Sequence, residues 1–212
     1  MKKIDSIFSI FSQRNPHPKI ELNYTNNYTL LVAVVLSAQS TDVGVNKVTA
    51  KLFQEIESPL DIIKVGEDGL KQHIKRIGLY NSKAKNIMAL SQKLLDDQHD
   101  DIPRDFEYLI SLPGVGRKSA NVILNSAFGQ PTIGVDTHVF RVSNRLGITK
   151  SKNVLQTEQQ LTKKIPAKFK LHAHHWLVLH GRYICKARKP NCEVCFIRDY
   201  CAYYKKISNS YD

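Results

Sequence analysis

Apolar residues recur along most of this chain at the spacing expected of helices. Residues 28–53 form a strongly apolar segment whose valines would also suit a strand, but its length favours a helix, a break at 40–42 and a second helix. Residues 155–165 and 172–185 continue the helical pattern, and no segment alternates convincingly as a strand does. We therefore expect an all-α fold. An amphipathic helix should begin the chain, with its apolar side formed by Ile4, Ile7, Phe8 and Phe11.

The most informative stretch is residues 109–142, in which a tight apolar turn, LPGVG at 112–116, joins two expected helices. Its glycines, Gly114 and Gly116, permit backbone conformations closed to other residues. The second helix should present free backbone N–H groups at its start, where a phosphate can bind. Arg117 and Lys118 lie at that position, and we expect Lys118 to be partly buried against the apolar turn.

Two other glycine-rich phosphate motifs are excluded at this turn. A Walker A loop needs glycine directly before lysine and four residues between its glycines, and G-x-G-x-x-G needs a third glycine. Asp136 precedes the next helical pattern and is a suitable N-cap, with Gly147 as the terminator. Because Lys118 and Asp136 each begin a helix, a compact packing could bring amine and carboxylate to one cleft.

The four cysteines, Cys185, Cys192, Cys195 and Cys201, have the spacing C-x6-C-x2-C-x5-C. Clustered thiolates suit either zinc or an iron–sulfur cluster, and the spacing alone does not decide between them. The longest of these loops contains three basic residues, which would form either a fixed phosphate-binding patch or an ordinary solvated charge run. They are Lys186, Arg188 and Lys189.

Composition limits the class of protein. With 212 residues, 42% of them hydrophobic, the chain can form one large or two small domains. A net charge of +12 favours a polyanionic partner, although charge alone would also suit a membrane surface. The longest apolar run, Leu30–Leu36, is too short to span a membrane. Asp5 interrupts the apolar part of any signal peptide, so we expect a cytosolic protein.

The segment LPGVGRKSANVILNSAFGQPTIGVDTHVFRV resembles the helix-hairpin-helix and the following Gly/Pro-rich loop with its aspartate in DNA glycosylases, most closely the bifunctional endonuclease III family. The resemblance extends over nearly the whole chain. It implies a six-helix bundle over residues 20–130 and a discontinuous second lobe, residues 1–19 with 131–212, facing it across a DNA groove. It also implies that the four cysteines ligate a [4Fe–4S] cluster.

The same resemblance assigns roles to individual residues. Lys118 would be the catalytic nucleophile and Asp136 its acidic partner. Gln39 and Leu79, each at a break between helices, would fill the gap left by an extruded base, although residue type alone would place Leu79 in a core. His138 either borders the cleft or serves backbone hydrogen bonding. The chain departs from the family at position 110, where Ile110 replaces an acidic residue that some relatives carry.

These roles imply a glycosylase that removes oxidised pyrimidines and cleaves abasic sites, acting as a monomer on damaged double-stranded DNA in the bacterial cytosol. A non-enzymatic DNA-binding module is the alternative from another class, but phosphate binding needs no acidic partner for Lys118. An adenine-excising relative would usually carry serine or a similar residue at that position.

Four histidines in the last long helical segment could suggest a metal site, but hydrogen-bonded structural roles are favoured for them. They are His172, His174, His175 and His180.

Overall fold

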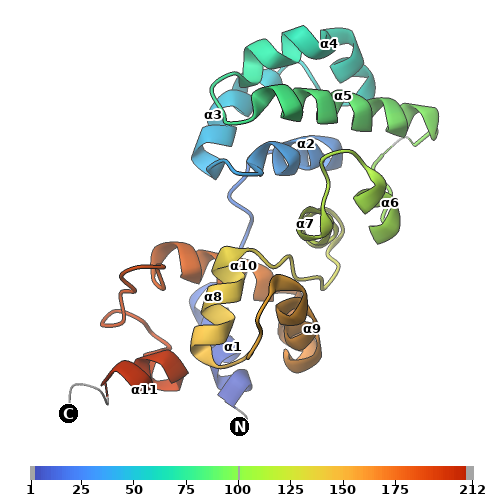
Figure 1. Ribbon diagram of the computed structural model, residues 1–212. Helices are drawn as coiled ribbons and strands as arrows, with labels where there is room; N and C mark the ends of the chain where they lie inside the picture. The colour runs from blue at the N-terminus through green and yellow to red at the C-terminus, as the bar shows by residue number, and fades with distance from the viewer. Residues whose placement is uncertain (1–2, 100, 209–212) are drawn as a thin grey trace. The chain divides into compact units, whose positions relative to one another are not determined.

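The computed structural model describes residues 3–99 and 101–208, in which eleven α-helices and one 3₁₀ turn occur without a strand. The expected all-α fold is confirmed. No helix in the described residues has the length and apolar character needed to cross a membrane. In chain order (Figure 1) the elements are α1 (Lys3–Arg14), α2 (Asn27–Ser37), α3 (Asp42–Leu52), α4 (Pro59–Ile74), α5 (Tyr80–Asp96), α6 (Phe106–Ser111), α7 (Arg117–Phe128), α8 (Thr137–Leu146), α9 (Val154–Lys164), α10 (Ala167–Tyr183), η1 (Arg198–Tyr200) and α11 (Ala202–Ser208).

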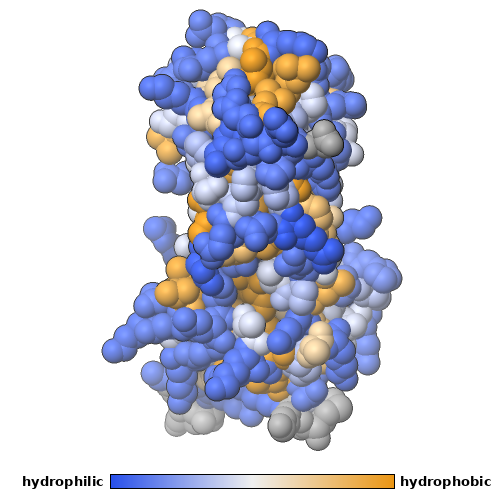
Figure 2. Space-filling model, turned by 90° about the vertical axis from the view of Figure 1, so that its right-hand side faces the viewer, coloured by the Kyte–Doolittle hydropathy of each residue, from blue (hydrophilic) through white to orange (hydrophobic). Residues whose placement is uncertain are grey.

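The chain divides into two compact units, each with its own apolar core. Residues 20–128 form the first, termed the bundle unit, which contains α2 to α7. Residues 1–19 and 129–212 form the second, termed the cysteine unit, which contains α1, α8 to α11 and the four cysteines. Figure 2 shows hydrophilic side chains over most of the face that it presents.

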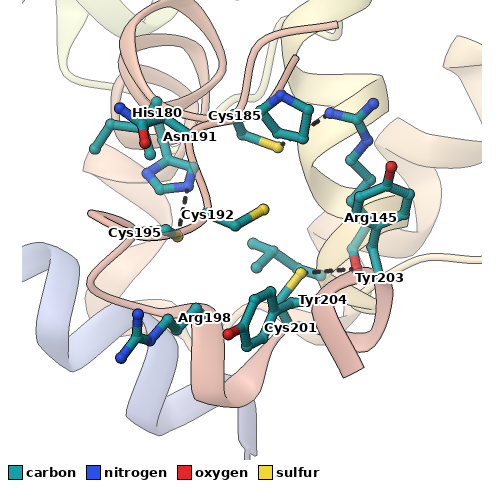
Figure 3. A pocket seen from close by; sticks show the side chains of 13 residues that line it. Arg145, His180, Cys185, Asn191, Cys192, Cys195, Arg198, Cys201, Tyr203 and Tyr204 are labelled. Atoms are coloured by element: carbon teal, nitrogen blue, oxygen red, sulfur yellow. Dashed lines mark hydrogen bonds between the residues drawn. The ribbon is translucent and has the colours of Figure 1, made fainter. Parts of the chain in front are cut away.

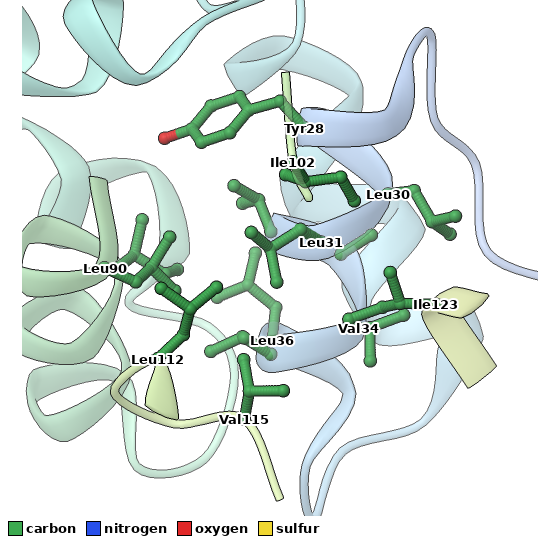
Figure 4. Packing of buried hydrophobic residues seen from close by; sticks show 14 of the residues in the cluster. Tyr28, Leu30, Leu31, Val34, Leu36, Leu90, Ile102, Leu112, Val115 and Ile123 are labelled. Carbon is green, nitrogen blue, oxygen red and sulfur yellow. The ribbon is translucent and has the colours of Figure 1, made fainter. Parts of the chain in front are cut away.

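The core of the bundle unit is built around α2 (Figure 4). This helix is apolar on all sides, and residues 28–36 are all buried, as expected for a helix enclosed by others. Its start is fixed by a capping box, in which Asn26 accepts from the Thr29 N–H while the Thr29 hydroxyl oxygen accepts from the Asn26 N–H. Helices α3, α5 and α7 pack against it. The hairpin between α6 and α7 is thereby attached to a rigid core.

The core of the cysteine unit joins the two ends of the chain. The expected amphipathic helix α1 buries Ile7, Phe8 and Phe11, and the Phe11 ring stacks 6.1 Å from Trp176 of α10. The Trp176 indole also donates to the Asn15 carbonyl oxygen at 2.8 Å. Helices α8 and α10 meet at Gly181, where a Cβ atom would lie 2.8 Å from His138 Cβ. Only glycine permits this close approach.

Candidate functional site

The hairpin between α6 and α7 is a tight turn held by its own backbone. The Val115 N–H donates to the Leu112 carbonyl oxygen at 3.0 Å, and both side chains are buried. Gly114 has a φ of 82°, and a Cβ atom there would lie 3.0 Å from Asn86 Cβ and 3.2 Å from Val35 Cγ1. Conformation and space therefore both require glycine at this position.

Gly116 differs from our expectation, because its φ is not in the positive region and a Cβ atom there would meet nothing within 4 Å. Its backbone therefore faces open space. Within the described residues, the N–H groups of Gly114, Gly116 and Lys118 donate no hydrogen bond. Exposed N–H groups at the start of a helix form an anion-binding surface, and the absence of a side chain at Gly116 allows an anion to approach closely.

Lys118 is the second residue of α7 and its side chain is exposed, so the expected burial against the apolar turn was wrong. The apolar residues of the turn point into the bundle core instead, away from the surface that carries the lysine. The guanidinium of Arg117 lies 5.0 Å from the centre of the Phe106 ring, a cation–π contact that fixes its position on the hairpin.

Asp136 is the N-cap of α8, as its position in the sequence predicted. Its Oδ1 atom accepts from the N–H groups of His138 and Val139, each at 2.8 Å. These two bonds satisfy N–H groups that the helix itself leaves unpaired, and they fix the carboxylate in place. The His138 ring lies beside α10, with Nδ1 3.1 Å from the Arg141 guanidinium.

Two arginines that the sequence analysis missed hold the loop that follows α10. Arg145 donates to the carbonyl oxygens of Lys186 and Ala187, both at 2.7 Å. Arg141 donates to the carbonyl oxygens of Gly181, at 2.8 Å, and Cys185, at 3.0 Å. The two arginines are one turn apart on the same face of α8, a spacing that could have drawn attention to them.

The loop that these arginines hold carries the three predicted basic residues, Lys186, Arg188 and Lys189. All three side chains are exposed. The Asn191 N–H donates to the Ile184 carbonyl oxygen at 2.9 Å, which closes the loop at its base. The basic residues are therefore displayed on a braced segment.

The four cysteines line one cavity at the end of α10 (Figure 3). Arg145 Nη1 lies 3.5 Å from Cys185 Sγ, and His180 Nε2 lies 3.6 Å from Cys195 Sγ. Burial, with a smaller contribution from the neighbouring thiols, raises the pKa of the Cys195 thiol to about 11. Four thiolates at such a site need bound cations to stabilise their charge.

The number and type of the donors indicate the kind of metal group that fits. Four cysteine side chains surround one cavity, which is the donor set of a sulfur-ligated metal group. An iron–sulfur cluster with four iron atoms takes one thiolate on each of them, so the four cysteines match it. The arrangement in Figure 3 suits such a cluster.

The histidines of α10 differ from expectation in their hydrogen bonding. His174, His175 and His180 are buried, but neither ring nitrogen of His175 has a hydrogen-bond partner within the described residues. Burial, with a smaller effect of His172, lowers the pKa of His175 to about 4. His175 is therefore a neutral core residue, not the hydrogen-bonded one we expected.

Gln39 and Leu79 both adopt left-handed backbone conformations, with φ of 54° and 58°. Their turns lie side by side in the bundle unit, because a Cβ atom on Gly78 would lie 3.9 Å from the Gln39 carbonyl oxygen. Leu79 is 56% exposed, which excludes the core position that residue type alone suggested. A bulky exposed side chain on a strained backbone is an indication of function.

Comparison with known proteins agrees with this geometry. Residues 32–167, which include the hairpin, Lys118 and Asp136, match the HhH-GPD superfamily of base excision DNA repair proteins. Residues 185–201, which begin and end at a cysteine, match the iron–sulfur binding domain of endonuclease III.

The chain belongs to the endonuclease III family.

Members of this family from Rickettsia conorii and Escherichia coli strain K12 are 57% and 53% identical to this chain over 201 residues. The match covers 95% of this chain in both cases, and 96% and 95% of the respective relatives. A solved structure described as a trapped endonuclease III–DNA covalent intermediate is 44% identical, with a TM-score of 0.90 over 98% of this chain and 99% of that one.

Membership of the endonuclease III family establishes the class of activity. The protein is a base-excision-repair DNA glycosylase that removes oxidised pyrimidines from duplex DNA and also cleaves abasic sites by β-elimination. It carries a [4Fe–4S] cluster. Among the alternatives raised by the sequence, the non-enzymatic DNA-binding module is therefore excluded.

Proposed function

We propose that Lys118 is the nucleophile of the glycosylase and lyase reactions. Its exposed amine stands at the start of α7, beside a hairpin whose free N–H groups can hold a phosphate. A DNA backbone bound there would place a nucleotide next to the amine. The similar structure of a trapped endonuclease III–DNA covalent intermediate supports covalent chemistry at this site.

The proposed reaction uses the lysine amine, the damaged nucleotide and water, which exchanges protons with them. The neutral amine attacks C1′ of the extruded nucleotide, and the base leaves with the electrons of its glycosidic bond. One amine proton passes to the departing base. Opening of the sugar then breaks the C1′–O4′ bond, O4′ takes a proton from water, and the resulting Schiff base between Lys118 and C1′ keeps the second amine proton and can accept electrons from C2′. Removal of a C2′ proton then breaks the C3′–O bond, which cuts the strand 3′ to the lesion. Hydrolysis of the Schiff base restores the amine.

Asp136 is proposed to stabilise the positive charge that develops on the sugar as the base leaves. Two backbone N–H groups hold its Oδ1 atom, so the carboxylate is pre-positioned and needs no rearrangement during the reaction. The apolar side chain of Ile110, 37% exposed on α6, cannot shuttle a proton as an acidic residue there could. Proton transfer should therefore depend on other groups or on water.

Gln39 and Leu79 are proposed to occupy the space that the extruded nucleotide leaves in the base stack. Both lie on neighbouring turns of the bundle unit, and Leu79 is an exposed apolar side chain that can wedge between bases. His138, on the first turn of α8, is proposed to contact the DNA near Asp136.

The DNA backbone is proposed to bind at two positively charged surfaces. One is the hairpin with Arg117, where Gly114 and Gly116 leave their N–H groups free; the other is the braced loop with Lys186, Arg188 and Lys189.

We further propose that Cys185, Cys192, Cys195 and Cys201 are the ligands that hold the cluster, because they line one cavity. The protein is proposed to work as a monomer in the bacterial cytosol, where its DNA substrate lies.

Borohydride reduction on a duplex with an abasic site tests the nucleophile. The unmodified protein should give a covalent adduct, and Lys118→Ala should reduce its yield by roughly 100-fold or more while DNA binding is retained. Lys64→Ala is the matched control, because it removes a lysine that is 66% exposed in the same unit. An undiminished adduct in Lys118→Ala, mapped by mass spectrometry to another amine, would overturn the assignment.

A further inference from the structure

The bundle unit contains a basic groove that has no role in the mechanism above. It has a volume of about 310 Å³ and lies between the middle of α3 and the end of α4. We call it the α3–α4 groove. It is lined by Lys47, Val48, Lys51, Gln72, His73, Lys75 and Arg76.

The cations of this groove are not neutralised by the protein. Within the described residues, no carboxylate lies within 4.0 Å of the charged nitrogens of Lys47, Lys51, Lys75 or Arg76. All four side chains are exposed. The Lys75 ammonium donates to a neutral group, the Gln72 side-chain oxygen, at 3.1 Å. The groove therefore presents four cations that have no ion-pair partner among the described residues.

Lysines elsewhere on α4 have acidic partners. Lys64 lies 3.5 Å from Asp61, and Lys71 lies 2.7 Å from Glu67. In the groove itself, His73 has a carboxylate partner, because its ring lies 3.3 Å from Glu55. Along α4, therefore, the two lysines outside the groove are paired, whereas Lys75 and Arg76 at its end are not, in the part of the chain that the structure describes.

The groove lies between the helix that follows Gln39 and the helix that precedes Leu79. Helix α3 begins three residues after Gln39, and α4 ends five residues before Leu79. Lys47 is five residues into α3 and Lys51 nine, about 8 and 14 Å along the helix axis. A duplex rises about 3.4 Å per base pair, so a duplex that runs along α3 from Gln39 would meet the two lysines roughly two to four base pairs away.

We infer that the α3–α4 groove binds the phosphate backbone of the duplex a few base pairs from the extruded nucleotide. This inference rests on the proposed insertion of Gln39 and Leu79 into the DNA. Lys47 and Lys51 are one helical turn apart, about 6 Å, which is close to two base-pair steps. An extended polyanion therefore suits the groove better than a single small anion.

Binding to a duplex with a stable abasic-site analogue, measured over a salt series, tests the inference. Each phosphate contact contributes about 0.9 to the slope of log K against log salt concentration. The double variants Lys47→Gln with Lys51→Gln, and Lys75→Gln with Arg76→Gln, should each make the slope shallower by about 1 to 2. They should also weaken binding several-fold at moderate salt.

The matched control is the double variant Lys64→Gln with Lys71→Gln, which removes the same charge from cations that already have partners. Its slope should stay close to that of the unmodified protein. If the control and the groove variants change the slope equally, or the groove variants leave it unchanged, the groove is not a contact surface. All six residues are on the surface, so thermal melting should show little change in folding.

Shortened duplexes provide a second measurement. Ending the duplex two base pairs from the lesion on one side should bring the slope of the unmodified protein to that of the groove variants, whereas shortening the other side should not. An equal effect from both sides would contradict the inference.

Borohydride trapping distinguishes a failure of the groove proposal from a failure of the Lys118 proposal. If the groove variants keep the salt slope of the unmodified protein and also trap normally, only the groove proposal is rejected. If Lys118→Ala traps as well as the unmodified protein, only the nucleophile proposal is rejected.

Discussion

Lys83 shows how one buried charge can organise two turns. Its side chain is only 4% exposed, and the ammonium donates to the Ser40 hydroxyl oxygen at 2.7 Å. Burial lowers the pKa of this lysine. The bond ties the turn that carries Gln39 to the helix that begins after Leu79. A charged group in this place costs stability, so its benefit should lie in the position of the turns.

Two substitutions at this contact should have different effects on the free energy of unfolding. Ser40→Ala leaves the buried ammonium without its acceptor and should destabilise the protein by about 1–3 kcal/mol. Lys83→Met removes the charge with little change in volume and should be near neutral or stabilising. Urea denaturation measures both. The expectation would be contradicted if both variants lost the same free energy of unfolding, or if Ser40→Ala lost none. Either result would show that the Ser40 hydroxyl does not stabilise the buried ammonium.

At the scale of elements, helix termini hold the groups that we propose to be reactive, one in each unit. Lys118 is at the start of α7, where exposed N–H groups favour an anion, and Asp136 is the N-cap of α8. The cap at Asp136 has a structural role as well as the proposed catalytic one. Substitutions can separate these roles because asparagine caps a helix about as well as aspartate does.

Asp136→Asn should retain the two cap hydrogen bonds but lose the negative charge. We expect base excision to slow by about 10²–10³-fold with little change in stability. Asp136→Ala should lose the same charge and, in addition, about 1 kcal/mol of stability from the missing cap. Single-turnover excision and thermal melting measure the two effects. Excision at the normal rate by the asparagine variant would show that the charge has no part in the reaction.

At the scale of the whole molecule, the chain has two cores that differ in what holds them together. The bundle unit depends on apolar packing around α2. In the cysteine unit, the segment after α10 consists of short elements whose cysteines line one cavity, and α11 has only seven residues. A short helix is unstable by itself, so metal ligation should supply much of the order in residues 184–208.

Loss of one cysteine should therefore loosen one part of the protein and not the other. We expect Cys201→Ser to lose bound iron and the brown colour of the cluster, and to exchange amide hydrogens faster over residues 184–208. Amides of α2 provide an internal control and should stay protected, because that helix belongs to the other core. Uniformly faster exchange in both units would contradict this division of stability. Stoichiometric zinc without iron in the unmodified protein would contradict the cluster.

Local signals in the sequence determined the helices, the hairpin and the family. The i, i+3, i+4 spacing of apolar residues locates a helix because one face must be buried, and this holds for α1 and α7. The N-cap role of Asp136 and the positive φ of Gly114 depend on the residue and its immediate neighbours. The four cysteines indicated a metal site because they lie close together in the sequence. Their spacing did not distinguish an iron–sulfur cluster from zinc, and the resemblance to a known family did.

Only the tertiary structure decided which surfaces these elements present. Lys118 is exposed because the apolar turn beside it packs into the core of the bundle unit, and Leu79 is exposed although Ile77, two residues before it, is buried in that core. Arg145 braces a loop some forty residues further along the chain, and the α3–α4 groove gathers unpaired cations from two helices. Each of these features depends on contacts between distant segments, which local spacing does not encode.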